Sequence, residues 1–482
     1  MRARFRRLTS PSAFPVLEAA ATAAGRVLGL GLVAAGLIAQ SLALGGCARA
    51  DVRQSFIILD IDTLRADHLG CYGYRRDTSP NLDAMAKGGV RFRWAFSQAP
   101  YTPPSQTSIL TSLYPSTHGV FGEITKSRKV PDEVTTLAEA MRDGGYQTAA
   151  FVDGGYMCTF WNIHQGFNVY DVVVGKGLAV IGPRTLSWLR DNSSRPFFLL
   201  VHTYNVHSPY DPGEAKRSLF QHGLDPPSPD FELTTANLSK LMNEGRRGKR
   251  NQLPANDIEF MKARYDACIR FVDDWIGRLF EELRRLGIDD RTTIVLLSDH
   301  GEEFQEHGSV LHEKLYSTIT HIPLIFKLPD ATQARVIDQV VQSIDVMPTI
   351  LDLAGVPPPA TPMHGRSLVP LLRGQSLPPR PAFGESLFFG RQRSLVDGSF
   401  QLLLALDNRR VELYNLRWDP LQQHNLRRRR PEIVQRMTEQ LMEQQQALES
   451  QVLFPPQEDR ELSPEVGAQL EALGYVESKK RQ

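Results

Sequence analysis

The sequence predicts an α/β fold with a large, mostly parallel central sheet flanked by helices, followed by a small C-terminal α+β subdomain. Two patterns favour this fold class. After Asp51, short apolar runs alternate with longer amphipathic stretches, as in strand–helix–strand units with a parallel sheet. From about Pro378, short strand-like runs follow one another closely and precede one amphipathic helix. This change of pattern predicts the separate α+β unit.

The expected strands of the central sheet are apolar runs that end at polar or turn-forming residues. They cover residues 55–62, 146–152, 195–204, 291–299 and 322–328, so we expect at least five strands. Amphipathic stretches predict helices at residues 79–89, 131–145 and 256–288. In the C-terminal part, the expected strands lie within 393–406 and 409–416, and the expected helix covers 431–450.

These patterns divide the chain into an N-terminal segment at residues 1–47, a large domain at 52–376 and a C-terminal subdomain with a tail at 377–482. A polar insertion at about 212–254 interrupts the large domain. An insertion of this kind is usually a surface excursion. Because it follows the segment "HSPYDPG" so closely, the sequence leaves open that it overhangs a site.

The N-terminal segment has the pattern of an export signal. Four arginines within the first seven residues precede the almost uncharged run "VLGLGLVAAGLIAQSLALGGC", which is typical of a secretory signal. A cysteine at position 47 after Leu44, Gly45 and Gly46 resembles a bacterial lipoprotein signal, in which Cys47 becomes the acylated N-terminus. Residues 27–46 are also long enough for an uncleaved membrane anchor. Either alternative predicts a location in the bacterial cell envelope, on the periplasmic side, with contact to the membrane through this segment.

Composition limits the possible partners. The 482 residues are 41% hydrophobic, and 55 lysines and arginines balance 54 acids to a net charge of +1. This balance gives no overall field that would recruit nucleic acid, so we expect no nucleic-acid partner. Only Cys71, Cys158 and Cys268 follow Cys47, so no disulfide framework is expected.

Polar residues at the ends of predicted strands are the first candidates for a site, because α/β sheets bind ligands beyond the carboxyl ends of their strands. "FIILDIDT" ends in Asp60, Asp62 and Thr63, and "TIVLLSDHGEEF" ends in Asp299 and His300. "FFLLVHTYNVHSPY" adds two histidines, at positions 202 and 207. Carboxylates with an imidazole can bind one divalent cation. The carboxylates favour Ca²⁺ and the imidazole favours Mn²⁺ or Zn²⁺. Taken by itself, an aspartate at a strand end caps a following helix more often than it binds a metal ion.

The stretch "APYTPPSQTSILTSLYP" places one hydroxyl, that of Thr102, before Pro103 and Pro104. Prolines fit the first turn of a helix, and a threonine at or before this turn is ordinarily a cap. A hydroxyl there also feels the positive end of the helix dipole, and a metal ion beside it would lower its pKa. The segment therefore predicts either a capping threonine or an activated nucleophile.

Taken together, these segments resemble the sulfatase family of the alkaline phosphatase superfamily. The resemblance covers nearly all of the chain after Asp51 and runs in the same order. It rests on "IDTLRADHLGCYGY", "SPNLDAMAKGGVRF", "TPPSQTSILTSLYP", "LSDHGEEFQEHG", "SIDVMPTILDLAGV", "HGRSLVPLL" and "VELYNLRWDPLQQHNL". It implies an alkaline phosphatase-like fold and one divalent metal ion, Ca²⁺ or Mn²⁺.

The resemblance also implies roles for individual residues. Asp62, Asp299 and His300 correspond to metal ligands, and Thr63 stands where many members have a second aspartate, so it is a weak ligand or none. Thr102 takes the nucleophile position. His207 matches a histidine that contacts the substrate oxyanion or protonates the leaving group. His312 falls where some members carry a lysine on the transferred group, and the nearby Lys314 is the alternative.

Two departures from the family pattern change the expected chemistry. The formylglycine motif Cys-x-Pro-Ser-Arg reads Thr102-Pro103-Pro104-Ser105-Gln106 here. Threonine is not oxidised to formylglycine, so no formylglycine is expected, and Gln106 removes a guanidinium. The family's Gly-Lys-Trp-His-Leu-Gly segment is replaced by "YQTAAFVDGG". Fewer fixed cations therefore face the substrate anion.

The sequence thus predicts a sulfatase-family, metal-dependent hydrolase that acts on sulfuric or phosphoric esters through a threonine nucleophile. Its substrate would be an anionic ester of a glycan, a lipid or a small molecule. Threonine is used by relatives that transfer phosphoglycerol or phosphoethanolamine, so such a transferase is one alternative. The other is a degenerate, sulfatase-like protein that binds anions without turnover.

Overall fold

The computed structural model describes residues 53–120, 127–246, 253–329, 334–387, 391–451, 453–454 and 459–472. The predicted export signal or anchor, with Cys47, lies outside these described residues. Within the described ranges, no helix is long and apolar enough to cross a membrane.

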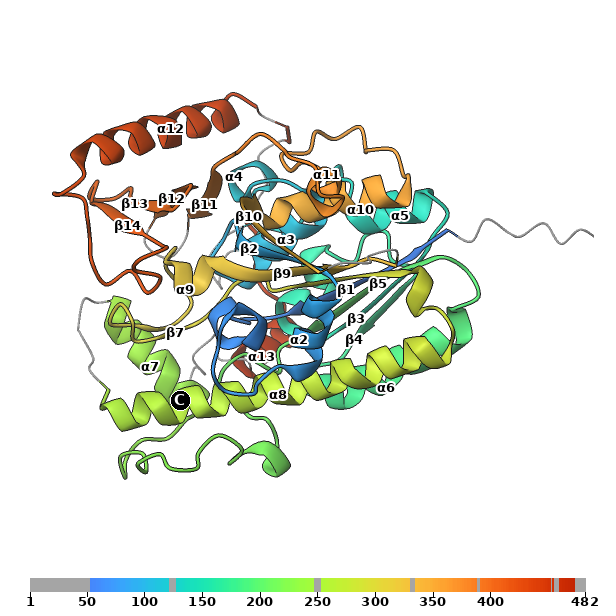
Figure 1. Cartoon of the computed structure of the whole chain (residues 1–482), viewed down its shortest axis with the longest axis horizontal. Coiled ribbons are helices and arrows are strands. Elements are labelled where there is room, and N and C mark those ends of the chain that lie inside the picture. The colour runs from blue at the N-terminus through green and yellow to red at the C-terminus, as the bar shows by residue number, and fades with distance from the viewer. Residues whose placement is uncertain are drawn as a thin grey trace, which may run out of the picture. The chain divides into compact units, whose positions relative to one another are not determined.

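A mostly parallel sheet of eight strands forms the centre of the described chain, in the order β10-β2-β9-β6-β1-β5-β3-β4 (Figure 1). The strands are β1 (Ser55–Ile61), β2 (Val90–Phe96), β3 (Gln147–Val152), β4 (Val169–Val172), β5 (Phe197–Thr203), β6 (Thr292–Leu297), β9 (His321–Lys327) and β10 (Arg335–Gln342). Only β9 runs antiparallel to its neighbours, β2 and β6. The predicted fold class is therefore confirmed.

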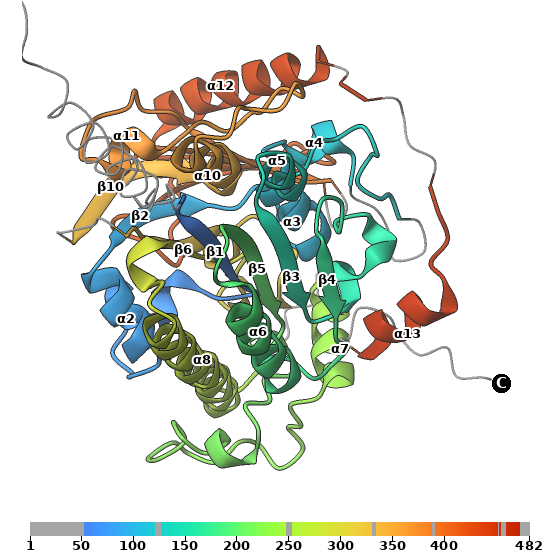
Figure 2. The same ribbon diagram turned by 90° about the vertical axis from the view of Figure 1, so that its right-hand side faces the viewer.

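Helices cover both faces of this sheet, as Figure 2 shows, because successive strand residues point to opposite faces. On β1, Ile57 and Leu59 join one apolar core and Phe56 and Ile58 join the other. The helices of the first face are α2 (Pro80–Lys87), α6 (Leu178–Asn192) and α8 (Ala255–Arg285). Those of the second face are α3 (Thr102–Thr111), α5 (Leu137–Asp143), α10 (Val346–Ala354) and α11 (Val369–Leu372).

The C-terminal part forms a second, antiparallel sheet in the order β11-β12-β13-β14, with one long helix against it. Its elements are β11 (Ala382–Ser386), β12 (Gln392–Asp397), β13 (Phe400–Ala405), β14 (Val411–Asn415) and α12 (Pro431–Glu449). Three short helices remain, α4 (Pro115–His118), α9 (Ser317–Thr320) and α13 (Pro464–Ala472). The strands β7 (Glu303–Phe304) and β8 (Val310–Leu311) form a separate hairpin. The boundary at 376–377 stays a prediction.

The predicted elements differ from the observed ones mainly at their ends. The helix expected at 131–145 begins only at Leu137, because Thr136 and Glu139 form a capping box and thereby fix the start of the helix. Strands β2, β4 and β10 and helix α6 were not expected. Strand β10 has an alternating exposed and half-buried pattern over most of its length, so it lacks the apolar run that identifies the central strands.

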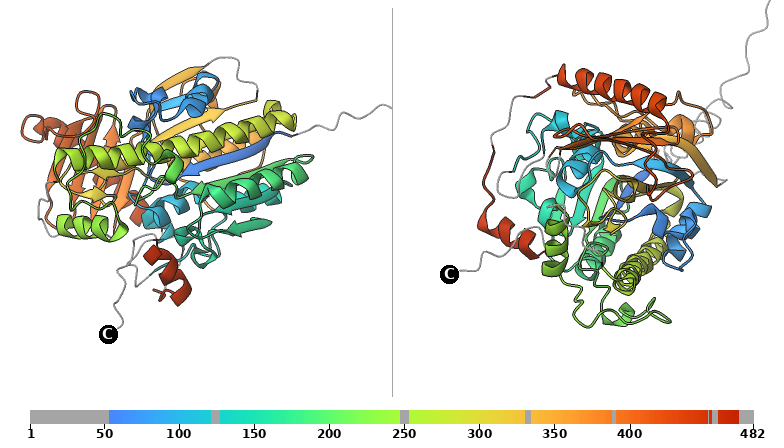
Figure 3. Two further views of the ribbon diagram at one scale, coloured as in Figure 1. Left: turned by 90° about the horizontal axis from the view of Figure 1, so that it is seen from below. Right: turned by 90° about the vertical axis from the view of Figure 1, so that its left-hand side faces the viewer.

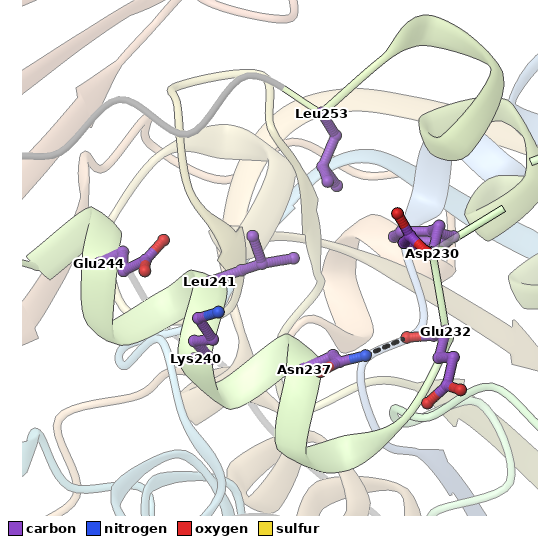
Figure 4. Close-up of a pocket in the computed structure, with 8 residues that line it drawn as sticks. Asp230, Glu232, Asn237, Lys240, Leu241, Glu244 and Leu253 are labelled. Atoms are coloured by element: carbon purple, nitrogen blue, oxygen red, sulfur yellow. Dashed lines mark hydrogen bonds between the residues drawn. The ribbon is translucent and has the colours of Figure 1, made fainter. Parts of the chain in front are cut away.

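The polar insertion contains α7 (Thr235–Arg246), which packs against β8. The Leu253 N–H donates to Gln305 Oε1 over 2.8 Å. The insertion therefore borders the chain that leads to His312. Beside α7 lies a pocket of about 320 Å³, lined by Asp230, Phe231, Glu232, Asn237, Lys240, Leu241, Glu244 and Leu253 (Figure 4).

A buried histidine outside the sheet provides a test of acid stability. Burial lowers the pKa of His118 to about 3, so the unfolded chain binds this proton at a higher pH than the folded chain. Stability is therefore complete above about pH 6.5 and falls by about 1.4 kcal/mol per pH unit as the pH drops toward 3. We expect His118→Gln to reduce this slope by that amount in urea titrations between about pH 6.5 and 5. An unchanged slope would contradict the assignment.

Candidate active site

Three potential metal ligands come together at the carboxyl ends of β1 and β6. Asp62 follows β1 directly, and Asp299 and His300 follow β6, which is the parallel neighbour of β1. One ligand atom from each of the three residues lies within 4.8 Å of the others, and all three side chains are buried. The parallel register therefore brings the three predicted ligands into one cluster, as the sequence indicated.

The donor atoms of this cluster fit a divalent cation. Asp62 Oδ1 and Asp299 Oδ2 are buried and have no hydrogen-bond partner among the described residues. The His300 Nδ1 faces the Gly301 carbonyl at 3.0 Å, which leaves Nε2 free to point toward the carboxylates. Two carboxylates and an imidazole are ordinary ligands for such an ion. Asp62, Asp299 and His300 would hold it.

Thr102 is the first residue of α3 and is completely buried. Its hydroxyl donates to Asp62 Oδ2 over 3.1 Å, and the hydroxyl oxygen, Thr102 Oγ1, lies 3.4 Å from His300 Nε2. The N-cap residue is Tyr101, and no side chain caps this helix. The interpretation of Thr102 as a capping threonine is therefore wrong. Its hydroxyl instead lies in the carboxylate cluster, at the positive end of the α3 dipole.

Two further histidines lie beside this cluster. His207 follows β5, and its Nε2 lies 3.2 Å from His312 Nε2, which is carried by the loop after β8. The His312 ring packs against the His300 ring with 4.3 Å between centroids. The structure thus brings together Thr102, the three candidate ligands and both predicted histidines from five separate chain segments.

The cluster carries more negative than fixed positive charge. Burial raises the pKa of Asp62 well above its usual value, and the nearby Asp299 and Asp60 raise it further. Burial and the charge of Asp299 likewise raise the pKa of Asp60. No lysine or arginine of the described residues forms an ion pair with these carboxylates. Arg65 lies near β1, but its guanidinium pairs with Asp67 and Glu306.

The histidines do not supply this missing charge. Burial lowers the pKa of His207 to about 4. Burial, followed by the neighbouring His300 and His207, lowers the pKa of His312 well below its usual value. Both rings are therefore neutral near pH 7, and their Nε2 atoms lie within hydrogen-bond distance of each other.

The other predicted residues lie around this centre. The Thr63 hydroxyl donates to the Asp62 carbonyl over 2.8 Å. Gln106 is fully buried on α3 and lies close enough to Asp60 to affect its pKa, although the two side chains do not meet the geometry of a hydrogen bond. Lys314 is half-buried, and its ammonium lies 5.9 Å from the centre of the Tyr316 ring.

The sequence placed His202 and Asp60 among the strand-end candidates but assigned neither of them a specific role. His202 is fully buried, its Nε2 lies 3.7 Å from Asp62 Oδ2, and neither ring nitrogen has a hydrogen-bond partner in the part of the chain that the structure describes. Asp60 and His202 are direct neighbours in the register of β1 with β5. The alternation that places Asp60 on the same side as Asp62 was the available signal. The pairing of β1 with β5 was not readable from the sequence.

Comparisons with known proteins agree with this geometry. The sulfatase family model matches residues 54–356, and the model for the C-terminal part of N-sulphoglucosamine sulphohydrolase matches residues 305–447. The chain is 26% identical to the uncharacterized sulfatase YidJ of Escherichia coli, over 78% of this chain and 83% of that protein. It is also 26% identical to the multifunctional alkaline phosphatase superfamily protein PehA of Trinickia caryophylli, over 66% of this chain and 77% of that protein.

Solved structures share the fold at lower identity. A structure described as being in complex with its substrate D-glucosamine-2-N,6-O-disulfate has a TM-score of 0.69 and 20% identity and covers 83% of this chain and 99% of its own. The phosphonate monoester hydrolase of Agrobacterium radiobacter has a TM-score of 0.68 and 19% identity, and the match covers 86% of this chain and 100% of that one. The chain belongs to the sulfatase family of the alkaline phosphatase superfamily and is a sulfatase-like ester hydrolase.

Proposed function

We propose that this protein cleaves monoanionic phosphoric esters, such as phosphodiesters or phosphonate monoesters, through Thr102 as a covalent nucleophile. The observation that carries the proposal is the hydrogen bond of 3.1 Å from the Thr102 hydroxyl to Asp62 Oδ2. A hydroxyl bonded to a carboxylate can lose its proton to that carboxylate as it attacks. A divalent ion bound at this cluster would supply Lewis-acid stabilisation of the developing negative charge.

The first step forms a bond from Thr102 Oγ1 to phosphorus and breaks the bond from phosphorus to the leaving oxygen. The His207–His312 pair supports this step, because an Nε2–H of the neutral pair can donate a hydrogen bond to that oxygen as negative charge develops on it. The oxygen leaves as the anion and takes its proton from solvent, while Asp62 keeps the proton of Thr102. Water or another hydroxyl then attacks phosphorus and loses its proton to solvent, the bond from phosphorus to Thr102 Oγ1 breaks, and Thr102 takes back the proton that Asp62 held. The side chains of Thr102, His207 and His312 are buried, and this burial excludes bulk water from the first step.

The charge of the site favours a monoanionic group. The carboxylates of Asp62 and Asp299 would offset the two charges of a divalent ion, and the neighbouring histidines are neutral. A dianionic phosphomonoester would add two negative charges without a fixed cation to receive them, whereas a diester adds one. A sulfate ester is also monoanionic. However, a threonine sulfate lacks the second hydroxyl through which formylglycine expels sulfate.

The proposal is tested with four aryl esters, a phosphodiester, a phosphonate monoester, a phosphomonoester and a sulfate, each with added Mn²⁺ or Ca²⁺. We expect the first two to give the highest kcat/KM. Acid-quenched protein should carry the mass of the transferred group on the peptide that contains Thr102. Products formed with an added hydroxyl acceptor separate transfer from hydrolysis. Turnover with a label on another residue, or with none, would contradict the assigned nucleophile.

A further inference from the structure

The segment between β14 and α12 forms a hollow of about 520 Å³ on the C-terminal sheet. Its lining combines aromatic, basic and amide groups and consists of Phe400, Asn415, Trp418, Asp419, His424, Leu426, Arg429 and Arg430. Trp418 is 86% exposed, more than any other large apolar side chain of the described residues. An indole left in water at the edge of a hollow leaves an aromatic face available for stacking.

The basic groups of this hollow are largely uncommitted. Arg429 is exposed, and its guanidinium forms no ion pair with a residue that the structure describes. Arg430 is exposed and lies 3.9 Å from Glu432, a distance at the limit of a weak surface pair. The acid of the lining, Asp419, is held by the backbone N–H groups of Gln423 and His424. The hollow therefore offers two guanidinium groups to an anion.

The hollow lies beside the chain that carries His312. The Gln423 amide donates to the Glu306 carbonyl over 3.0 Å, and the Ser317 N–H donates to Gln422 Oε1 over 2.6 Å. Residues 306 and 317 flank position 312 in the sequence. In Figure 1 the segment after β14 lies next to α9, and Figure 3 shows the C-terminal sheet beside the main sheet from two further sides.

We propose that this hollow is a second binding site, which holds a sugar unit carrying an anionic group. The flat apolar face of a sugar ring stacks on Trp418, while Arg429 and Arg430 bind the sulfate or phosphate. The concave shape favours a sugar chain over a lipid surface, because a sugar unit can occupy a hollow that a flat bilayer cannot enter. One part of this proposal rests on the proposed function, namely that the hollow holds a longer substrate whose other end reaches Thr102. The binding of an anionic sugar in the hollow is independent of the proposed function.

The binding test uses the full chain with Thr102→Ala, so that no substrate is consumed. The probes are dextran sulfate, uncharged dextran and vesicles of phosphatidylglycerol. We expect saturable binding of dextran sulfate, about fivefold weaker in Trp418→Ala and about tenfold weaker in R429A/R430A. The matched control is R427A/R428A, which removes the same charge from the same run but not from the lining, and it should change the affinity by about twofold or less.

Three results would overturn the proposal: equal losses in both double variants, no loss in Trp418→Ala, or binding to vesicles in preference to dextran sulfate. Introduced into otherwise wild-type protein, Trp418→Ala and R429A/R430A should leave kcat/KM on a small aryl ester unchanged, because the lining of the hollow does not touch Thr102. A lack of all ester turnover together with intact, Trp418-dependent binding would refute the proposed function and leave the binding site standing.

Discussion

Replacing Thr102 with alanine should lower kcat on an aryl phosphodiester by about 10⁴-fold or more, the usual scale for loss of a covalent nucleophile. The physical reason is that the variant lacks the oxygen that bonds to phosphorus, while Asp62, Asp299 and His300 remain in place. Thr102→Ser keeps a hydroxyl at the start of α3 and should retain much of the turnover, with the label now on serine. Steady-state rates and peptide masses measure both effects.

The matched control is Thr111→Ala at the other end of α3. The Thr111 hydroxyl is also buried, but its one hydrogen bond to a described residue goes to the Thr107 carbonyl of its own helix, at 2.6 Å. This variant should keep kcat within a few fold. Turnover by Thr102→Ala within tenfold of wild type would mean that the hydroxyl is structural, and the proposed chemistry would have to be abandoned.

Asp299→Asn should change metal binding and stability in opposite directions. In chelator, the variant should be more stable than wild type, because it relieves repulsion among the buried carboxylates of Asp60, Asp62 and Asp299. With added metal, wild type should gain about 3 kcal/mol at a metal concentration near 100 times Kd, whereas the variant should gain almost nothing. Its turnover should fall by about 10³-fold or more, since the cation stabilises the transition-state charge.

Thermal shifts with Ca²⁺, Mn²⁺, Mg²⁺ and Zn²⁺ and metal analysis of the purified protein measure this prediction, and the largest shift identifies the preferred ion. Asp345→Asn is the control, because Asp345 is equally buried but is held by Arg380 and by the backbone N–H groups of Gln342 and Arg366. It should lose stability and keep its metal response. A full metal response in Asp299→Asn would remove Asp299 from the ligand set.

Much of the sheet and of the candidate site was predictable because both follow local rules. A buried strand shows a continuous apolar run, and strands of a parallel sheet end at the same edge, so Asp62, Asp299 and His300 could be expected to meet. Strand β10 was missed because its alternating exposure hides such a run. The antiparallel direction of β9 could not be predicted, because an apolar run specifies burial and not direction.

The sequence by itself determined the fold class, the family resemblance and the candidate ligands, since these depend on spacing and residue type along the chain. Tertiary structure decided which partner each polar atom has. A threonine at the start of a helix can bond its own backbone or a distant carboxylate, and only the tertiary position of the start of α3 beside the end of β1 made that partner Asp62. Likewise, the register of β1 with β5 placed His202 beside Asp60, and the fold of the C-terminal sheet left Trp418 exposed beside Arg429 and Arg430. These contacts join residues far apart in the sequence, so no local pattern encodes them.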